Sequence, residues 1–340
     1  MKVHENIPIA KLTTMRLGGP ARYVIEVESR NEVPEAIKFA KEHELPIWVM
    51  GGGANTIGHD AGFEGVILLN KIMGFEEHVG GDKITIKVGG GAIWDEFVDL
   101  MSKRGYTGVE ALSLIPGTVG AAPVQNIGAY GQSAGDTLVA VEAYDLIKEK
   151  FVNIPKSEMG LEYRRSRFNH GADEGRYFIT SVTFELKKGE LKPPFYNSLQ
   201  RYISTHGVTD FTPQNIRRIV CEIRNEKLPD PKVEASAGSF FKNVILNKRE
   251  VAEAELKNIP VWKNQDGSGK INAGWLIETA GLRGGELGGF RVSEKAALIL
   301  INDSAVSYGD LVRARQEIID AVKEKFGYEL EQEPVEIPER

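Results

Sequence analysis

The sequence predicts a protein of two or three domains in which strands and helices alternate around glycine-rich loops. Its 340 residues exceed the size at which a single hydrophobic core keeps growing. Stretches with apolar side chains at every second position are interleaved with stretches of helical periodicity. Residues 51–55 and 117–131 hold too much glycine and alanine for either element. We expect these loops to present backbone amides to a phosphate or a flat ring, with a surface turn as the alternative.

The first part of the chain is expected to form a strand, a helix and two more strands. Residues 21–27 alternate like a half-buried strand, and Asn31 is a candidate N-cap for a helix over 32–42. A short buried strand follows at 45–50 and leads directly into the first glycine-rich loop. The next regular element, at 65–69, is a strand.

The central part is expected to be rich in strands. Residues 82–88 form a strand, and three glycines then open a helix that Gly105 ends in a left-handed conformation. Further strands are expected at 139–147 and 177–186. Residues 187–202 contain two adjacent prolines and are expected to form an irregular loop that can move.

A change in composition marks the C-terminal part. A helix over 212–227 ends at two closely spaced prolines, which suits a domain linker. An amphipathic helix over 311–326 stops at Gly327, and an acidic tail over 329–339 follows.

The glycine-rich loops do not match two common phosphate-binding motifs. A dinucleotide fingerprint requires a third glycine where Thr56 stands and a helix after the loop, whereas a strand follows here. Near residues 267–270 the lysine is followed by Ile271 instead of serine or threonine, so a P-loop is excluded as well.

Composition narrows the class of protein further. A single cysteine, Cys221, forbids an internal disulfide and favours a reducing compartment. The six histidines are scattered, so no metal site is expected, and a net charge of -6 argues against nucleic acid despite the basic cluster of Arg164, Arg165 and Arg167. No apolar run is long enough to span a bilayer and no export signal is evident, so we expect a soluble cytoplasmic protein.

Several short motifs occur in a fixed order along nearly the whole chain. They lie at residues 18–21, 51–55, 115–131, 163–168, 227–232, 237–243 and 330–333. Each is weak alone, but together and in this order they resemble the UDP-N-acetylenolpyruvoylglucosamine reductase family. These are flavoenzymes of bacterial peptidoglycan synthesis, and hence of cell wall biogenesis, cell shape and cell division.

The resemblance implies an α+β protein that binds FAD through a fold of the vanillyl-alcohol-oxidase (PCMH) type. Its two FAD-binding subdomains would comprise residues 1–70 and 71–226, and a C-terminal α+β substrate-binding domain would comprise residues 227–329. The loop at 187–202 matches the subgroup with a tyrosine lid. The tail at 330–340 would return near the first subdomain, and a monomer is expected.

The resemblance also implies the reaction. NADPH reduces FAD, and flavin N5 then passes the hydride to C3 of the enolpyruvyl group of UDP-N-acetylglucosamine enolpyruvate, giving UDP-N-acetylmuramate. Ser239 would deliver a proton to C2 as the general acid. Arg164 would grip the substrate carboxylate with its planar fork, and Glu333 would act with that arginine.

Binding residues follow from the matched motifs. Those implied for the substrate are Tyr130, Tyr196, Arg224, Lys227 and Asn243, with Tyr196 covering the diphosphate. Those implied for FAD are Gly51, Gly52, Gly53, Ala54, Asn55, Gly117, Thr118, Gly120, Gln125, Asn126, Gly128, Ala129 and Tyr130.

The chain departs from the family pattern at two places. Ala54 stands where serine is usual, which removes one polar contact to the FAD phosphates. In the tail, Gln332 stands where proline is common and Pro334 where valine is common, so Glu331 and Glu336 are alternatives to the expected glutamate.

Two other functions are weighed against the reductase. The chain could be another FAD oxidase or dehydrogenase of the same fold, or a non-catalytic sugar-nucleotide-binding protein. The joint presence of Arg164, Ser239 and Glu333 argues against the second.

Overall fold

The computed structural model describes residues 1–338, and contacts within the chain divide it into two compact units. Unit 1 comprises Met1–Asn6, Ala21–Gly52 and Glu64–Glu226. Unit 2 comprises Ile7–Pro20, Gly53–Phe63 and the chain from Lys227 onward. The boundaries expected from the sequence, at 70 and 226, stay a prediction, and the last two residues of the expected 330–340 tail lie outside the described part.

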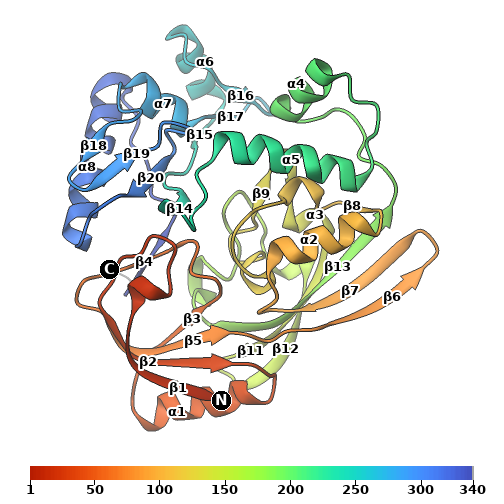
Figure 1. The fold of residues 1–340 in the computed structure, drawn as a ribbon, viewed down its shortest axis with the longest axis vertical. Coiled ribbons are helices and arrows are strands. Elements are labelled where there is room, and N and C mark those ends of the chain that lie inside the picture. Colours follow the sequence, from red (N-terminus) through yellow and green to blue (C-terminus); the bar gives the residue numbers. More distant parts are fainter. Residues whose placement is uncertain (339–340) are drawn as a thin grey trace. The chain divides into compact units, whose positions relative to one another are not determined.

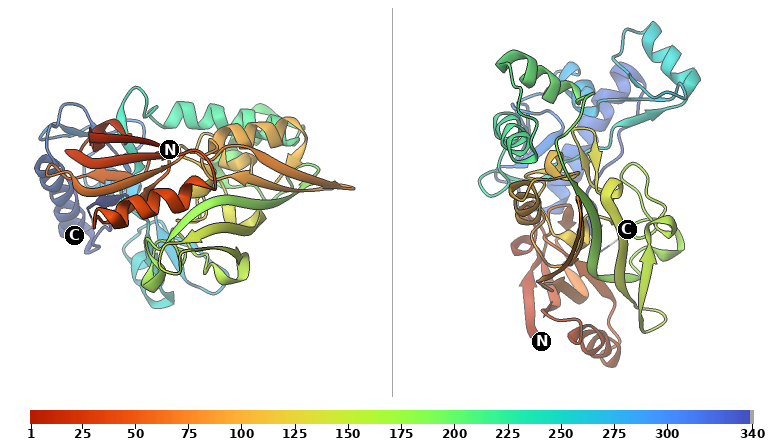
Figure 2. Two further views of the ribbon diagram at one scale, coloured as in Figure 1. Left: turned by 90° about the horizontal axis from the view of Figure 1, so that it is seen from below. Right: turned by 90° about the vertical axis from the view of Figure 1, so that its right-hand side faces the viewer.

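The first sheet of unit 1 has four strands. In spatial order they are β1 (Lys2–Pro8), β2 (Pro20–Val27), β5 (Phe63–Asn70) and β3 (Ile47–Met50). The last two are parallel, with Ile47 opposite Val66. Helix α1 (Glu32–Glu42) runs alongside this sheet, and Val33 and Ile37 on its buried face pack with the strands (Figure 2).

The helix over 32–42 is confirmed, but the expected role of Asn31 is wrong. Asn31 precedes the helix with φ −71° and ψ −26°, already helical, and its side chain makes no capping bond within the described residues. The turn before the helix replaces the cap, because the carbonyl of Ser29 accepts from the amide of Glu32 and that of Arg30 accepts from the amide of Val33.

The second sheet of unit 1 is antiparallel and has six strands (Figure 1). Five follow one another in the order β12 (Lys150–Pro155), β11 (Leu138–Asp145), β13 (Tyr177–Lys188), β7 (Lys83–Gly89) and β6 (Phe75–Gly80), and β8 (Tyr106–Thr107) pairs with β13. Helix α2 (Trp94–Lys103) packs on the sheet through Trp94 and Phe97, which contact Phe184 of β13. Gly105, with φ 75°, follows the helix in the expected left-handed conformation.

Residues 187–202 are only partly the irregular loop that the sequence predicts. Strand β13 continues to Lys188, and helix α4 (Asn197–His206) begins within the segment. Leu199 and Ile203 bury one face of α4 against α5 (Pro213–Lys227), so tertiary packing stabilises a helix of weak intrinsic preference. A very short α-helix, α3 (Ala134–Thr137), completes the α-helices of unit 1 within the described residues.

Unit 2 contains small sheets around one hydrophobic core. Its strands are β14 (Ala235–Ser239), β20 (Ile299–Asn302), β19 (Phe290–Val292) and β18 (Glu286–Leu287) in one sheet, β15 (Val244–Leu246), β17 (Gly269–Ile271) and β16 (Trp262–Lys263) in another, and β21 (Val335–Ile337) with β4 (Thr56–Gly58) in a parallel pair. Its helices are α6 (Lys248–Leu256), α7 (Ala273–Thr279) and α8 (Tyr308–Phe326).

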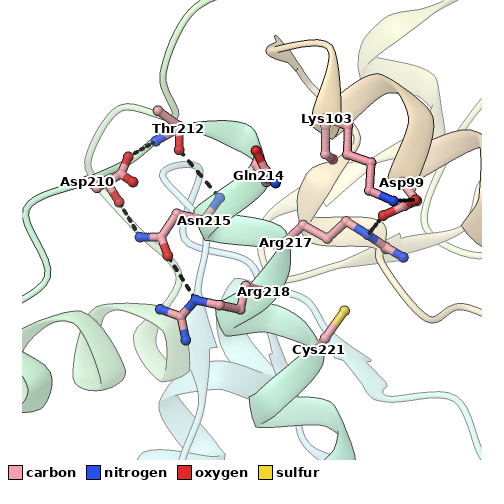
Figure 3. Close-up of a pocket in the computed structure, with 10 residues that line it drawn as sticks. Asp99, Lys103, Asp210, Thr212, Gln214, Asn215, Arg217, Arg218 and Cys221 are labelled. Carbon is pink, nitrogen blue, oxygen red and sulfur yellow. Dashed lines mark hydrogen bonds and ion pairs between the residues drawn. The ribbon is translucent and has the colours of Figure 1, made fainter.

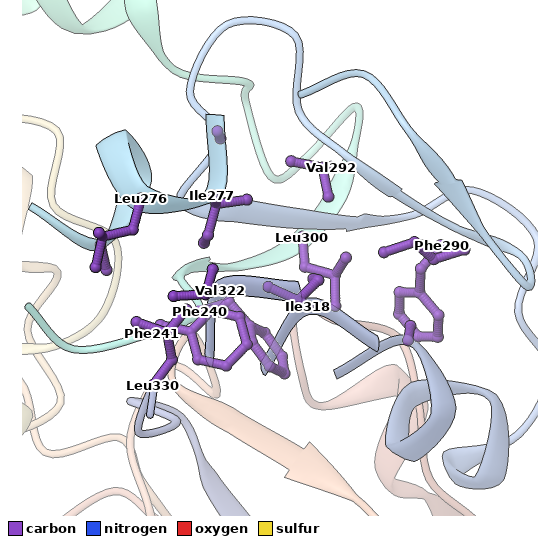
Figure 4. Packing of buried hydrophobic residues seen from close by; sticks show 14 of the residues in the cluster. Phe240, Phe241, Leu276, Ile277, Phe290, Val292, Leu300, Ile318, Val322 and Leu330 are labelled. Atoms are coloured by element: carbon purple, nitrogen blue, oxygen red, sulfur yellow. The ribbon is translucent and has the colours of Figure 1, made fainter. Parts of the chain in front are cut away.

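The core of unit 2 joins segments that are far apart in sequence. Phe240 and Phe241, which follow β14, pack with Ile318 of α8 and with Leu330 near the C-terminus (Figure 4). Helix α8 begins at Tyr308, after the capping residue Ser307 and three residues earlier than expected from the sequence. It ends at Gly327, with φ 80°, as the sequence predicts. Across residues 1–338, no helix combines the length and apolar character needed to cross a membrane.

Candidate active site

The two glycine-rich loops approach each other closely within unit 1. A Cβ atom at Gly51 would lie 2.5 Å from Thr118 Oγ1, and one at Gly52 would lie 3.0 Å from Gly117 Cα. A side chain at residue 51 would force Thr118 to move, and one at residue 52 would force Gly117 to shift by a few tenths of an ångström, so glycine is favoured at both positions. The result is a backbone cradle with little side-chain bulk.

This cradle contains polar groups that have no hydrogen-bond partner within the described residues. Thr118 is 6% exposed, and its Oγ1 has no partner within residues 1–338. The amide of Gly52 likewise finds no acceptor in the described part of the chain. Because buried polar groups are nearly always paired, these donors are suited to the phosphate oxygens of a bound dinucleotide.

Other amides of the second loop are already engaged. The amide of Val119 donates to Ala92 O at 2.9 Å, and the amide of Gly120 donates to Gly90 O at 2.8 Å. A Cβ at Gly120 would lie 2.9 Å from the same Gly90 oxygen. Gly120 therefore holds the second glycine-rich loop against residues 90–92. The expected contact between Gly120 and FAD stays a prediction.

Residues 128–133 form a tight hairpin with a tyrosine in its turn. Strands β9 (Gly128–Ala129) and β10 (Gln132–Ser133) pair antiparallel, and Tyr130 and Gly131 between them have φ 48° and 86°. Positive φ at both central residues is typical of a type I′ turn, which closes hairpins with two residues. Tyrosine adopts this conformation at a cost of about 1–2 kcal/mol, so its place at the tip suggests a role in binding.

Tyr130 lies beside two other residues expected to bind the substrate. Its ring meets that of Tyr196 edge to face at 5.9 Å between centroids. Burial raises the pKa of Tyr130 while Arg224 opposes the rise, and burial raises the pKa of Tyr196 to about 12. Arg224 donates to Leu114 O at 3.3 Å, and its Nε has no acceptor within the described residues. Both tyrosines stay neutral, and Arg224 offers a donor to a ligand.

Arg164 occupies an unusual backbone conformation. Its φ is 55°, and Asn169 holds the turn by donating to Arg164 O at 3.1 Å and accepting from Ser166 N at 2.8 Å. The Arg164 guanidinium reaches Gly128 O at 3.4 Å. Asn126 donates to Glu162 O at 3.1 Å. This bond holds residues 162–169, which we call the arginine segment, against the residues that precede the hairpin.

In unit 2, Ser239 follows an irregularity in strand β14. Ser236 pairs with Ile301 but Ser239 pairs with Ile299, so the strand holds one extra residue, and Gly238 takes φ 71°. Such a bulge turns the following side chain away from the regular alternation. Half-buried Ser239 lines a cavity of about 280 Å³.

The sequence did not single out most of the residues that share this cavity. They are Leu228, Asn272, Gly274, Trp275, Glu278, Ala296, Ala297, Leu298 and Ile299. Asn272 caps helix α7 by accepting from Trp275 N at 2.8 Å. Asn272 is a usable signal in the sequence, since asparagine is a preferred N-cap residue at a helix start.

The structure places the other expected site residues of unit 2, Glu333, Asn243 and Lys227, as follows. The amide of Glu333 donates to Phe240 O at 2.9 Å, directly after Ser239. Asn243 is half-buried and accepts from Ala273 N at 3.1 Å at the start of α7. Lys227 is the exposed last residue of α5.

A cavity in unit 1 is lined by a different set of residues. It measures about 450 Å³ and lies between α2 and α5 (Figure 3). Asp99 pairs with Lys103 at 2.6 Å and with Arg217 at 3.0 Å, and Arg218 pairs with Glu222. Most of its charged side chains are therefore already paired, and it contains none of the expected site residues. In the described residues, no cluster of metal-ligating side chains occurs.

Comparison with known proteins identifies the family. Residues 21–150 match the FAD binding domain family, and residues 230–337 match the C-terminal domain family of UDP-N-acetylenolpyruvoylglucosamine reductase. The chain is 36% identical to the UDP-N-acetylenolpyruvoylglucosamine reductase of Ralstonia nicotianae, over 97% of this chain and 98% of that protein. The chain belongs to the UDP-N-acetylenolpyruvoylglucosamine reductase family.

Two further similarities agree with that membership. The Escherichia coli protein of the same name is 36% identical over 92% of this chain and 90% of its own length. The crystal structure of the Thermus caldophilus reductase superposes with a TM-score of 0.67, covering 99% of both chains at 23% identity. That likeness, with the matched FAD binding domain, confirms the expected α+β fold of the vanillyl-alcohol-oxidase type.

As a family member the chain is a flavoprotein oxidoreductase that binds FAD and uses NADPH as reductant. The cradle fits the cofactor, because the Gly52 amide, the Thr118 hydroxyl and the absence of side chains at residues 51 and 52 suit a bound diphosphate. The individual contacts assigned to FAD and to the substrate stay predictions.

Proposed function

We propose that this chain reduces the enolpyruvyl ether of UDP-N-acetylglucosamine enolpyruvate to UDP-N-acetylmuramate, with Ser239 as proton donor. The observation that carries the assignment is the place of Ser239: it lines a cavity after a bulge, and the next residue accepts a hydrogen bond from the amide of Glu333. Bound FAD, reduced by NADPH, supplies the hydride that adds to C3.

Ser239 completes the reduction by protonating C2. Addition of a hydride to C3 leaves an electron pair on C2 that is shared with the adjacent carboxylate. A serine hydroxyl is a weak acid, so it can protonate only such a strongly basic centre. The Ser239 proton forms the new C2–H bond, and the alkoxide regains a proton from water.

Arg164 and Glu333 stabilise the charge that develops on the substrate. The planar guanidinium of Arg164 can donate two parallel hydrogen bonds to the substrate carboxylate and so favour its enolic form. The backbone of Arg164 is held in a left-handed turn, which limits where its side chain can reach. Glu333 orients the donor groups in this step.

The other expected residues would bind the two nucleotides. Tyr130, Tyr196 and Arg224 form one cluster, in which the arginine suits a diphosphate and the neutral rings suit a sugar or a base. Lys227 and Asn243 would help to place NADPH or substrate. Ala54 would contact the FAD phosphates through its amide alone, since it lacks a hydroxyl.

Replacing Ser239 with alanine tests the proposal. Ser239→Ala should leave flavin reduction by NADPH nearly unchanged and slow reoxidation by the enolpyruvyl substrate by roughly 10²–10⁴-fold, the usual contribution of general acid catalysis. Stopped-flow flavin absorbance measures both half-reactions, and Ser304→Ala, at an exposed serine of unit 2, serves as control. Normal rates in both half-reactions would refute the role of Ser239.

The alternative of another FAD oxidase or dehydrogenase of this fold gives a different result. In the reductase, sustained NADPH consumption requires the enolpyruvyl substrate, whereas such an oxidase would consume its own reductant and oxygen without it.

We also propose that the protein acts as a monomer in the cytoplasm. Sedimentation at several concentrations would reveal any larger assembly.

A further inference from the structure

The tail around Glu333 is fixed by backbone pairing on both sides. Gln332 faces Phe241 in an isolated antiparallel bridge, and the amide of Glu333 donates to Phe240 O at 2.9 Å. Two residues later, Val335 begins β21, which pairs with β4. Glu333 and the proline after it therefore form a short link between two fixed points.

The side chain of Gln332 spans this link. Its Oε1 accepts from Arg315 Nη1 at 2.7 Å. Its Nε2 donates to Pro334 O at 2.8 Å and to Glu336 Oε1 at 3.1 Å. One amide thus connects the residues on either side of Glu333.

The partners of Gln332 are themselves held in a buried network. Arg315 and Glu336 pair at 2.7 Å with side chains only 10% and 8% exposed. The other carboxylate oxygen of Glu336 accepts from Tyr308 at 2.6 Å and lies 3.1 Å from His59 Nε2, and the rings of His59 and Tyr308 are 3.9 Å apart. The Gln332 amide is therefore anchored to a rigid charged pair instead of to mobile surface groups.

We propose that Gln332 is a positioning residue for the reduction: through Arg315 and Glu336 it fixes the backbone of Glu333 and thereby the place of the Glu333 carboxylate. The inference rests on the proposed function, in which Glu333 acts in the substrate half-reaction. Charge stabilisation depends steeply on distance, so a carboxylate displaced by about 1 Å can lose on the order of 100-fold in rate.

Gln332 can be removed without breaking the buried ion pair. Arg315 retains Glu336 as partner, and Glu336 retains Tyr308 and His59, so no charge becomes uncompensated. Methionine matches the length of glutamine but makes none of its three hydrogen bonds. Gln332→Met should therefore fold and loosen the tail.

The test separates the two half-reactions of the FAD-loaded enzyme. Gln332→Met should slow reoxidation by the enolpyruvyl substrate by roughly 10- to 100-fold and leave reduction by NADPH within about twofold. Gln316→Met makes the same change on the exposed face of α8, where the glutamine bonds only Asp320 among the contacts described, and should change neither rate. Should Gln332→Met fail to fold, Gln332→Asn keeps an uncharged amide in the network, is one methylene too short to make all three bonds, and should slow reoxidation by a smaller factor.

Combining Gln332→Met with Glu333→Ala tests whether Gln332 acts through Glu333. In Glu333→Ala, adding Gln332→Met should cause no further slowing of reoxidation, because the positioned group is gone. An unchanged reoxidation rate in Gln332→Met, or an undiminished effect in the Glu333→Ala background, would overturn the inference. A Glu333→Ala enzyme that reoxidises at the normal rate would instead refute the role given to Glu333 in the proposed function, and the inference with it.

Discussion

The segments that carry Arg164 and Glu333 are fixed by different means. Around Arg164 the bonds are local: Asn169, five residues away, holds Arg164 O and Ser166 N. Around Glu333 the bonds are distant, because Arg315 comes from helix α8. A local turn fixes the conformation of one residue, whereas a buried ion pair fixes a whole segment. Damage to the first should stay local, and damage to the second should spread through unit 2.

The largest expected change in the free energy of unfolding concerns the buried ion pair that holds the segment around Glu333. Arg315→Met leaves the buried Glu336 carboxylate without its cation, which should lower the free energy of unfolding by about 3–5 kcal/mol. Urea unfolding followed by circular dichroism measures it. Arg313→Met, at an exposed arginine two residues earlier that pairs with Asp310, should change stability little. Similar losses in both variants would contradict the assigned importance of the buried pair.

A smaller effect is expected on the Arg164 side. Asn169→Leu removes the two hydrogen bonds that hold the turn and should lower the free energy of unfolding by about 1–2 kcal/mol. Asn169→Asp keeps an oxygen acceptor for Ser166 N but loses the donor to Arg164 O, so it should fall between leucine and the natural residue. The comparison would fail if Asn169→Leu destabilised the protein as much as Arg315→Met.

The left-handed turn itself can be tested with glycine. Arg164 has a φ of 55°, which costs about 1–2 kcal/mol for a residue with a side chain but nothing for glycine. Arg164→Gly should therefore leave the free energy of unfolding unchanged or raise it by up to about 1 kcal/mol, while abolishing turnover. Arg165→Gly lacks this compensation and should lower stability by about 0.5–1 kcal/mol. Equal losses in the two variants would mean that the turn is not strained.

The last expected effect depends on pH. Hydrogen bonds from Arg176 lower the pKa of Asp145 from 3.8 to about 2, and Arg176 also binds Asp173, which pairs with Arg167 of the arginine segment. A depressed pKa stabilises the fold above the unfolded value and loses that contribution as the pH falls toward 2. The stability difference between the natural protein and Asp145→Asn should therefore shrink between about pH 4 and pH 2. Unfolding at a series of pH values measures this difference, and a difference that stays constant over the range would contradict the role given to Arg176.

Much of the secondary structure follows from sequence periodicity. The helix over 32–42 has the expected bounds, and Gly105 and Gly327 end helices as expected. Helix α4 was not predicted, because its stability comes from burial of Leu199 and Ile203 and not from its own sequence.

The candidate site was predicted as a set of residues but not as a geometry. Glycine patterns indicated the cradle at residues 51–55 and 117–120, yet they did not show that the Gly120 amide is engaged by Gly90. The left-handed conformations of Tyr130 and Arg164 left no trace in the sequence, since neither is glycine. The amide network of Gln332 depends on pairing with distant elements, which no local pattern contains.

The extra residue in strand β14 separates two demands that a regular strand combines. In a regular strand, the alternation that buries Ala235 and Ala237 would also dictate the direction of the residue at position 239. The bulge at Gly238 removes that dependence. The residue at position 239 and the core of unit 2 can therefore change independently. A different side chain could line the cavity at position 239 while the sheet that contains β14 keeps its packing.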